Sequence, residues 1–190
     1  AVLVVDDRYV IGSRSGPVIL TEHMKVDVHE LIRDRNICVV TVRDTRKALS
    51  ALSAAFFDHP AERMKMIGIT GTNGKTTTAF LTAGILQEAG YRVGMIGTIE
   101  SYDGRRRETV KNTTPESCEI HRLLSRMVEN ECDCCVMEVS SQGIALQRTA
   151  DVFFDIGVFL NIEPDHIGKG EHATFSEYLY CKSRLMRQCG

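Results

Sequence analysis

The segment MKMIGITGTNGKTTTAFLTAGILQEAG, residues 64–90, decides the fold. It begins with an apolar run, Met64 to Thr70, that is typical of a buried strand. A loop rich in glycine and threonine follows, and then a helical stretch that Gly90 closes from the C′ position. Glycines let backbone amides approach phosphate oxygens closely, and a helix N-terminus favours negative charge. The segment therefore predicts a strand, a phosphate-binding loop and a helix, in that order.

The loop itself predicts ATP binding. Lys75 is expected to reach the terminal phosphates, and the Thr76 hydroxyl is expected to ligate Mg²⁺. The commoner pattern GxxxxGK[ST] has glycine at the position that Ile69 occupies here. The alternative is a surface turn with an incidental lysine. The residues predicted to bind the nucleotide are Gly71, Thr72, Asn73, Gly74, Lys75, Thr76 and Thr77.

The chain after this segment repeats the strand, loop and helix pattern. Three further apolar runs, 93–98, 134–140 and 156–162, predict strands. Thr114 followed by Pro115 predicts the start of a helix that runs to Asn130. Thr174 and Glu177 form a capping box for a last helix that reaches Cys189. We expect an α/β fold of the P-loop NTPase type, with a mostly parallel sheet flanked by helices.

The first sixty residues are organised differently. Short strands are predicted at 2–7, 9–13 and 37–42, and Asp44 can cap a helix that runs to Phe57. The helix would place Ala48, Leu49, Leu52, Ala55 and Phe56 on one apolar face. A break near His59 and Pro60 divides the chain into predicted domains 1–60 and 61–190.

Composition restricts the class of protein without indicating its chemistry. Of the 190 residues, 43% are hydrophobic and 25% are charged, which are globular values. A net charge of −2 gives no reason to expect binding to nucleic acid, and no run is long enough to insert in a membrane. Seven irregularly spaced cysteines fit reduced thiols in the cytoplasm. The CDCC run, 132–135, is expected to supply core thiols, because its spacing matches no zinc template.

Two charged residues outside the loop are candidates for chemistry. Glu138 ends an apolar strand, and the carboxyl edge beside a phosphate loop is well placed to hold Mg²⁺. The alternative is a strand-end glutamate in solvent. Lys182 lies within an apolar stripe of the last helix, which is formed by Tyr178, Leu179, Leu185, Met186 and Cys189. A lysine on a buried face is paired, snorkelling or deprotonated.

GTNGKTT after an apolar strand resembles the Mur ligases and their folylpolyglutamate synthase relatives. Further matching blocks are NTTPES at 112–117, MEVSSQGIALQR at 137–148, NIEPDHI at 161–167 and YLYCKSRL at 178–185. The family joins an amine to a carboxylate at the expense of ATP. The blocks are most similar to the branch that extends UDP-N-acetylmuramoyl-L-alanyl-D-glutamate by one amino acid in peptidoglycan synthesis.

The resemblance implies roles for individual residues. Lys75 would act in catalysis, and Thr76 and Glu138 would hold one Mg²⁺. His166 and Lys182 would hold and orient a second Mg²⁺, and Lys182 would first react with CO₂ to form a carbamate. The muramoyl nucleotide would be bound by Asn112, Thr113, Thr114, Ser140 and Arg148, although the threonines also suit simple helix capping.

The resemblance also implies an incomplete set of domains. Residues 1–60 would be part of a uridine-nucleotide domain, residues 61–190 an incomplete ATP-binding domain, and the domain that receives the amino acid would be absent. The 190 residues are then expected to be inactive alone, cytoplasmic and monomeric, and the added amino acid stays open. The alternatives are another ligase of this superfamily, acting on folate, a different muramoyl peptide or a polyglutamate, and a non-catalytic nucleotide-binding module.

Overall fold

The computed structural model describes residues 2–6, 19–21, 24–26, 38–165, 167–168 and 172–190. These residues form two compact units, 1–49 and 50–190, whose division falls within helix α2 (Thr45–Phe56). The predicted boundary lies some ten residues later, and the assignment of each part to a domain of a larger enzyme stays a prediction. None of the described helices is long and apolar enough to cross a membrane.

The first unit contains two small pairs of strands. Strands β1 (Val2–Asp6) and β4 (Cys38–Val42) pair in parallel, and β2 (Ile19–Thr21) pairs with β3 (Met24–Val26) in an antiparallel ribbon. The first and third strands predicted for this region are therefore present. The predicted strand at 9–13 lies outside the described residues.

Helix α2 begins as predicted but buries a different face. The Asp44 carboxylate accepts hydrogen bonds from the backbone N–H groups of Arg46 and Lys47, as an N-cap does. The expected apolar face is wrong, because Leu52 and Phe56 are exposed. The helix buries Ser50, Ser53 and Ala54 instead. The Ser50 hydroxyl accepts a hydrogen bond from the backbone of Asp151, a tertiary contact that apolar periodicity does not predict.

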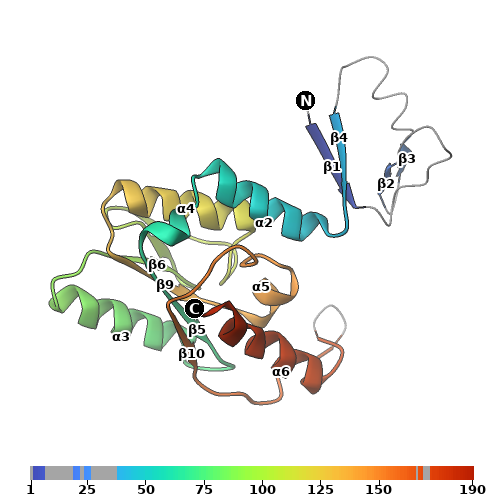
Figure 1. Cartoon of the computed structure of the whole chain (residues 1–190). Helices are drawn as coiled ribbons and strands as arrows, with labels where there is room; N and C mark the ends of the chain where they lie inside the picture. The colour runs from blue at the N-terminus through green and yellow to red at the C-terminus, as the bar shows by residue number, and fades with distance from the viewer. Residues whose placement is uncertain (1, 7–18, 22–23, 27–37, 166, 169–171) are drawn as a thin grey trace. The chain divides into compact units, whose positions relative to one another are not determined.

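The second unit is built on a six-stranded sheet of order β10-β5-β9-β6-β7-β8 (Figure 1). Strands β5 (Lys65–Thr70), β6 (Val93–Ile96), β9 (Cys134–Glu138) and β10 (Ile156–Phe159) run parallel, which confirms the predicted sheet. An unpredicted antiparallel hairpin, β7 (Ser101–Tyr102) and β8 (Arg107–Glu108), extends the sheet beyond β6.

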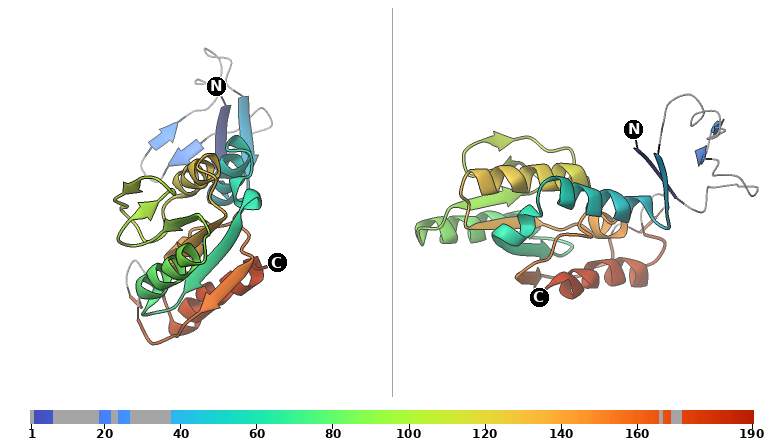
Figure 2. Two further views of the ribbon diagram at one scale, coloured as in Figure 1. Left: turned by 90° about the vertical axis from the view of Figure 1, so that its left-hand side faces the viewer. Right: turned by 45° about the horizontal axis from the view of Figure 1, so that its top comes forward.

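Helices cover both faces of this sheet (Figure 2). Helix α3 (Lys75–Glu88) packs on one face through Ala79 and Ala83, and Gly90 follows its end with φ +91°, as the C′ prediction requires. On the other face lie α4 (Ser117–Glu129), α5 (Ser141–Ala145) and the short 3₁₀ helices η2 (Pro60–Arg63) and η3 (Arg184–Gln188). The core is therefore two apolar layers with the sheet between them.

The last predicted helix is interrupted. Helix α6 (Phe175–Ser183) continues directly into η3, so the helical path reaches Gln188 but changes its pitch. The Thr174 hydroxyl caps α6 by accepting a hydrogen bond from the backbone of Glu177. The Glu177 carboxylate returns to the backbone N–H of Ala173 rather than to that of Thr174. Half of the capping box is thus present as predicted.

Candidate active site

The phosphate loop joins β5 to α3 at the carboxyl edge of the sheet. Gly74 caps α3 with φ +85°, a conformation that side chains disfavour, and so lets the chain turn sharply into the helix. Asn161, just after β10, holds the loop from outside. Its side-chain oxygen accepts a hydrogen bond from the backbone N–H of Asn73 at 3.0 Å, and its amide donates to the Asn73 carbonyl at 3.0 Å. The loop is therefore preformed.

Lys75 is directed toward its own loop. Its Nζ donates to the carbonyl oxygens of Gly71 at 2.9 Å and Thr72 at 3.0 Å. Burial lowers the pKa of this ammonium, while the nearby carboxylates of Glu138 and Asp165 act in the opposite sense. A bound phosphate would offer charged oxygens in exchange for the two neutral carbonyls.

Glu138 is buried at the end of β9, with 1% of its surface exposed. The Thr76 hydroxyl donates to its Oε2 at 2.9 Å, so the two predicted magnesium ligands are in contact. Thr98 donates to Oε1 from its backbone at 2.9 Å and to Oε2 from its hydroxyl at 3.0 Å. A Cβ at Gly97 would lie 2.5 Å from Oε1, so a larger residue at position 97 would displace the carboxylate from this position.

Lys182 reaches the same loop from α6. It is 1% exposed, its Nζ donates to the Gly71 carbonyl at 2.7 Å, and it lies 4.7 Å from the centre of the Tyr178 ring. Burial and repulsion by Lys75 lower the pKa of Lys182 to about 8. The prediction of a lysine on a buried face is confirmed. The predicted stripe is wrong at Leu179 and Met186, each 40% exposed. Met186 lies in η3, after the change of pitch that follows Ser183.

The proposed substrate residues line a pocket of about 260 Å³ beside the loop. Four of its side chains are lysine or arginine, which suit an anion, and most of the rest carry hydroxyl or amide groups. Its lining residues are Lys75, Lys111, Asn112, Thr113, Thr114, Ser140, Ser141, Gln142, Arg148, His172 and Lys182. The structure thus brings all five predicted substrate residues to one pocket with Lys75 and Lys182.

Thr114 does not cap a helix, which corrects the sequence prediction. Helix α4 begins at Ser117, and its N-cap is Glu116. The Thr114 hydroxyl instead donates to the Glu138 carbonyl at 3.0 Å and accepts from the Ser140 backbone at 2.9 Å. This threonine therefore ties the loop before α4 to the end of β9.

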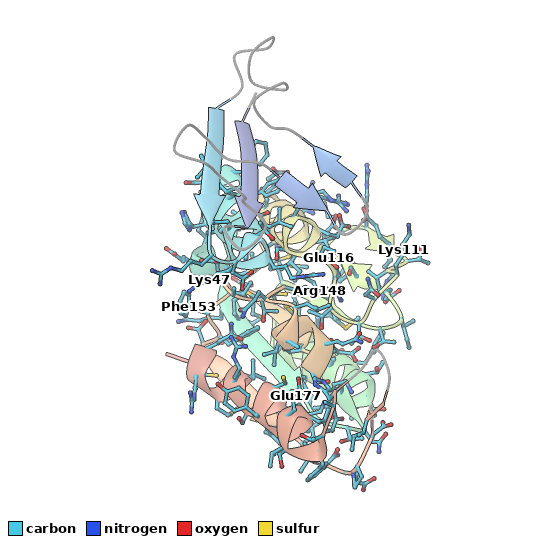
Figure 3. All side chains as sticks on the ribbon, turned by 90° about the vertical axis from the view of Figure 1, so that its right-hand side faces the viewer. Lys47, Lys111, Glu116, Arg148, Phe153 and Glu177 are labelled. Carbon is cyan, nitrogen blue, oxygen red and sulfur yellow. The ribbon has the colours of Figure 1, made fainter. Side chains whose placement is uncertain are left out.

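Arg148 fixes the same loop with part of its guanidinium. It pairs with Glu116 at 2.6 Å, and a second nitrogen donates to the Thr114 carbonyl at 3.0 Å. Figure 3 shows Arg148 and Glu116 directed toward one another. The Nε atom is buried and has no hydrogen-bond partner within the part of the chain that the structure describes.

The remaining predicted residues differ in how far they are placed. Asn73 and Thr77 are exposed at the start of α3, and Asn112 is exposed on the pocket rim. Ser140 caps α5 by accepting a hydrogen bond from the Gly143 backbone. His166 lies outside the described residues.

Several residues of the site were missed by sequence reasoning. Thr98 comes two residues after the end of β6, and Glu138 ends β9. Because the carboxyl ends of parallel strands meet at one edge of a sheet, the sequence could have predicted that Thr98 lies near Glu138. Tyr178 was read only as an apolar residue, yet its hydroxyl lies 3.0 Å from that of Thr72. His172 is 3% exposed and lines the pocket, and no pattern in the sequence marks it.

A larger cavity, of about 590 Å³, opens at the opposite edge of the sheet. Residues at the amino ends of the parallel strands line it, including Lys65, Asp133 and Asp155. It contains no glycine-rich loop, and ligands of open α/β sheets bind outside the carboxyl ends of the strands. We therefore place the candidate site at the smaller pocket.

The CDCC run supplies buried thiols, as expected. Cys132, Cys134 and Cys135 are buried and free, and burial raises the pKa of each thiol. Among the residues that the structure describes, no group of three or more histidine, cysteine or acidic side chains could hold a metal ion.

Comparison with known proteins identifies the family. Residues 69–190 match the Mur ligase middle domain. The chain is 41% identical over 186 residues to a UDP-N-acetylmuramoyl-L-alanyl-D-glutamate–2,6-diaminopimelate ligase of Clostridium perfringens, covering 97% of this chain and 37% of that protein. It is 44% identical over 149 residues to the corresponding L-lysine ligase of Enterococcus faecalis, covering 77% of this chain and 29% of that protein.

Solved structures agree on the fold. A 2,6-diaminopimelate ligase of this kind superposes with a TM-score of 0.62 at 23% identity, over 77% of this chain and 30% of the other. MurF from Acinetobacter baumannii gives a TM-score of 0.55 at 24% identity, over 83% of this chain and 31% of the other. The chain thus spans about a third of the length of the relatives it matches. On the family match and the identity to these ligases, the chain belongs to the Mur ligase family.

Proposed function

We propose that the protein is an ATP-dependent ligase of peptidoglycan synthesis, which adds one amino acid to UDP-N-acetylmuramoyl-L-alanyl-D-glutamate. The observation that carries the proposal is the convergence of Lys75, the Thr76–Glu138 pair and Lys182 on one loop, beside a pocket lined by Arg148 and hydroxyl groups. The curated relatives that match most of this chain are named for that dipeptide as substrate.

The phosphate loop is assigned to the nucleotide. The residues proposed to bind ATP are Gly71, Thr72, Asn73, Gly74, Lys75, Thr76 and Thr77. Support comes from the left-handed Gly74 at the start of α3 and from the clamp by Asn161, which together fix the conformation of the loop at the carboxyl edge of the sheet.

Magnesium fits the oxygen pair Thr76 and Glu138. Mg²⁺ prefers oxygen ligands and uses one or two carboxylates together with substrate phosphates. A buried carboxylate whose Oε2 lies 2.9 Å from a hydroxyl at the first turn of α3 meets that preference. Bound there, the ion would neutralise charge on the transferring phosphoryl group.

Lys182 is proposed as the carbamylated lysine that the family resemblance implies, with His166 as its partner at a second magnesium. An amine must be unprotonated to attack CO₂, and a pKa near 8 leaves roughly one amine in ten free at pH 7. A carbamate would replace one of two adjacent cations by an anion, and so remove the repulsion between Lys182 and Lys75.

The reaction we propose has two steps. The substrate carboxylate attacks the γ-phosphorus of ATP, which forms an acyl phosphate and releases ADP. The amine of the incoming amino acid then attacks the acyl carbon, and phosphate leaves as the amide forms. Lys75 stabilises negative charge on the transferring group, and Arg148 with Asn112, Thr113, Thr114 and Ser140 orients the muramoyl substrate.

The incoming amino acid stays unassigned. Relatives named for 2,6-diaminopimelate and for L-lysine match the chain at similar identity, 41% and 44%. The cytoplasmic location expected from the sequence belongs to this proposal, and the free thiols of the described residues are consistent with it.

The test is product formation by the protein isolated from its native source. Incubation with ATP, magnesium, the muramoyl dipeptide and each of several amino acids should release ADP with only one of them, and mass spectrometry should detect the matching tripeptide. A product built on folate, or on another muramoyl peptide, would assign the protein to a different ligase of the superfamily. ATP binding without product would support a nucleotide-binding module.

A further inference from the structure

Thr98 contacts two residues of the candidate site, Glu138 and Thr113, and has no role in the function proposed above. It follows β6 in a turn that the Gly97 backbone closes by donating to the Glu100 carbonyl at 3.1 Å. β6 is the neighbour of β9, with Ile96 beside Met137, so this turn lies next to the end of β9. The sheet therefore delivers Thr98 to Glu138 from the side opposite β5.

Thr98 contacts Glu138 through both of its polar groups. Its backbone N–H donates to Oε1 at 2.9 Å, and its hydroxyl donates to Oε2 at 3.0 Å. With the bond from Thr76, three of roughly four lone-pair sites of the carboxylate are engaged. The orientation of the carboxylate is therefore fixed before any ligand binds.

The hydroxyl of Thr98 also faces the substrate pocket. Its Oγ lies 3.0 Å from that of Thr113, a pocket residue. The Thr98 hydroxyl is the donor in both contacts but carries a single proton, so Glu138 and Thr113 compete for it. Because Thr113 offers only a neutral oxygen, the proton favours the Glu138 carboxylate.

We infer that Thr98 is a positioning residue that sets the magnesium-binding orientation of Glu138 and links it to the substrate residue Thr113. This inference rests on the proposed function, because it needs a magnesium nucleotide beside Glu138. Without the hydroxyl, Oε2 keeps only the bond from Thr76, and the carboxylate can turn away from the ion. Loss of the hydroxyl should therefore weaken nucleotide binding in the presence of magnesium and leave binding without magnesium unchanged.

The variant that isolates the hydroxyl is Thr98→Val, which keeps the shape and the backbone N–H. Calorimetric titration with ATP in magnesium should show affinity reduced about tenfold, as expected for a hydrogen bond to a charged group. The same titration in EDTA should match the wild type. Thr98→Ser, which keeps a hydroxyl, should restore affinity to within about twofold. Thr82→Val, on α3 and away from Glu138, is the matched control.

A double-mutant cycle tests whether Thr98 acts through Glu138. In a Glu138→Gln background, Thr98→Val should cause no further loss in magnesium, because its target is already gone. Thr113→Val removes the competing acceptor, so affinity in magnesium should equal or slightly exceed that of the wild type, and a loss would contradict this arrangement. It also keeps the test available if Thr98→Val does not fold.

The outcomes separate the two claims. Failure of the folded wild type to bind ATP in magnesium would contradict the proposed function. Wild-type binding with an unaffected Thr98→Val, or an equal loss in magnesium and in EDTA, would overturn the role of Thr98 and leave the proposed function standing.

Discussion

Two clusters of charge in the second unit follow opposite rules. In the hairpin cluster, Arg126 pairs with Asp103 and Glu108, and Arg122 pairs with Glu108 and Glu119. Hydrogen bonds from Arg126 and Arg122 hold the pKa of Glu108 low. Burial would raise the pKa of Asp103, but backbone hydrogen bonds from Arg106 and Arg105, together with the Arg126 side chain, lower it. Every charge there has an opposite partner.

The loop cluster is arranged differently. Lys75 and Lys182 both donate to the Gly71 carbonyl, and burial lowers the pKa of each although nearby carboxylates act in the opposite sense. Ion pairs hold the hairpin against α4, whereas two buried cations on one neutral carbonyl favour binding of an anion. Both clusters are built from charged side chains. The way these charges are paired distinguishes a structural network from a candidate binding site.

Breaking the hairpin cluster should have the largest effect on stability. Arg126→Ala leaves Asp103, 2% exposed, without its cationic partner and should lower the free energy of unfolding by about 2–3 kcal/mol. Urea unfolding measures this value. The ATP affinity of the folded variant should stay within about twofold of the wild-type value. If the variant were as stable as the wild type, the ion pairs of the hairpin cluster would have no structural role.

His121 gives a second test, through pH. It is fully buried on α4, and neither ring nitrogen has a hydrogen-bond partner among the described residues. Burial lowers its pKa to about 4. Because the unfolded chain takes up the proton near pH 6.5, stability is fully present above that pH and is lost as pH falls toward 4. The unfolding equilibrium should shift by up to about tenfold per pH unit.

The variant His121→Leu isolates this contribution. Its unfolding free energy should fall less steeply between pH 6.5 and 4 than that of the wild type. Equal slopes would mean that His121 does not account for the pH dependence.

Lys182→Met sharpens the comparison with the smallest effect. It removes a buried cation that Lys75 repels, so stability at pH 7 should rise by about 1 kcal/mol, measured in buffer depleted of CO₂. The gain should be largest below pH 8 and should shrink as pH rises toward 10.5, where the wild-type lysine loses its proton in both states. If Lys182→Met lowered the stability instead, the contacts of the Lys182 ammonium would outweigh the free energy of burying its charge, as the ion pairs do in the hairpin cluster.

The residues that the sequence placed correctly are those whose role follows from local pattern. The phosphate loop lies between a strand and a helix, Glu138 ends a buried strand, and Lys182 lies on a buried helix face. Each depends on neighbours within a few positions along the chain.

The errors arise where distant contacts decide. Thr114 has the signature of an N-cap, but its hydroxyl bonds to Glu138 and Ser140, some twenty-five residues away. The strands β7 and β8 span two residues each, too short for any alternation to register. The burial of Ser50 on α2 depends on a contact with Asp151, about one hundred residues later.

The central claim is that the loop cluster is a nucleotide site that assembles within these 190 residues. Its most direct test is calorimetric titration with magnesium ATP, followed by the muramoyl dipeptide. We predict saturable ATP binding that Lys75→Ala abolishes, with dipeptide binding in the adjoining pocket. No ATP binding, by a chain that circular dichroism shows to be folded, would contradict the claim.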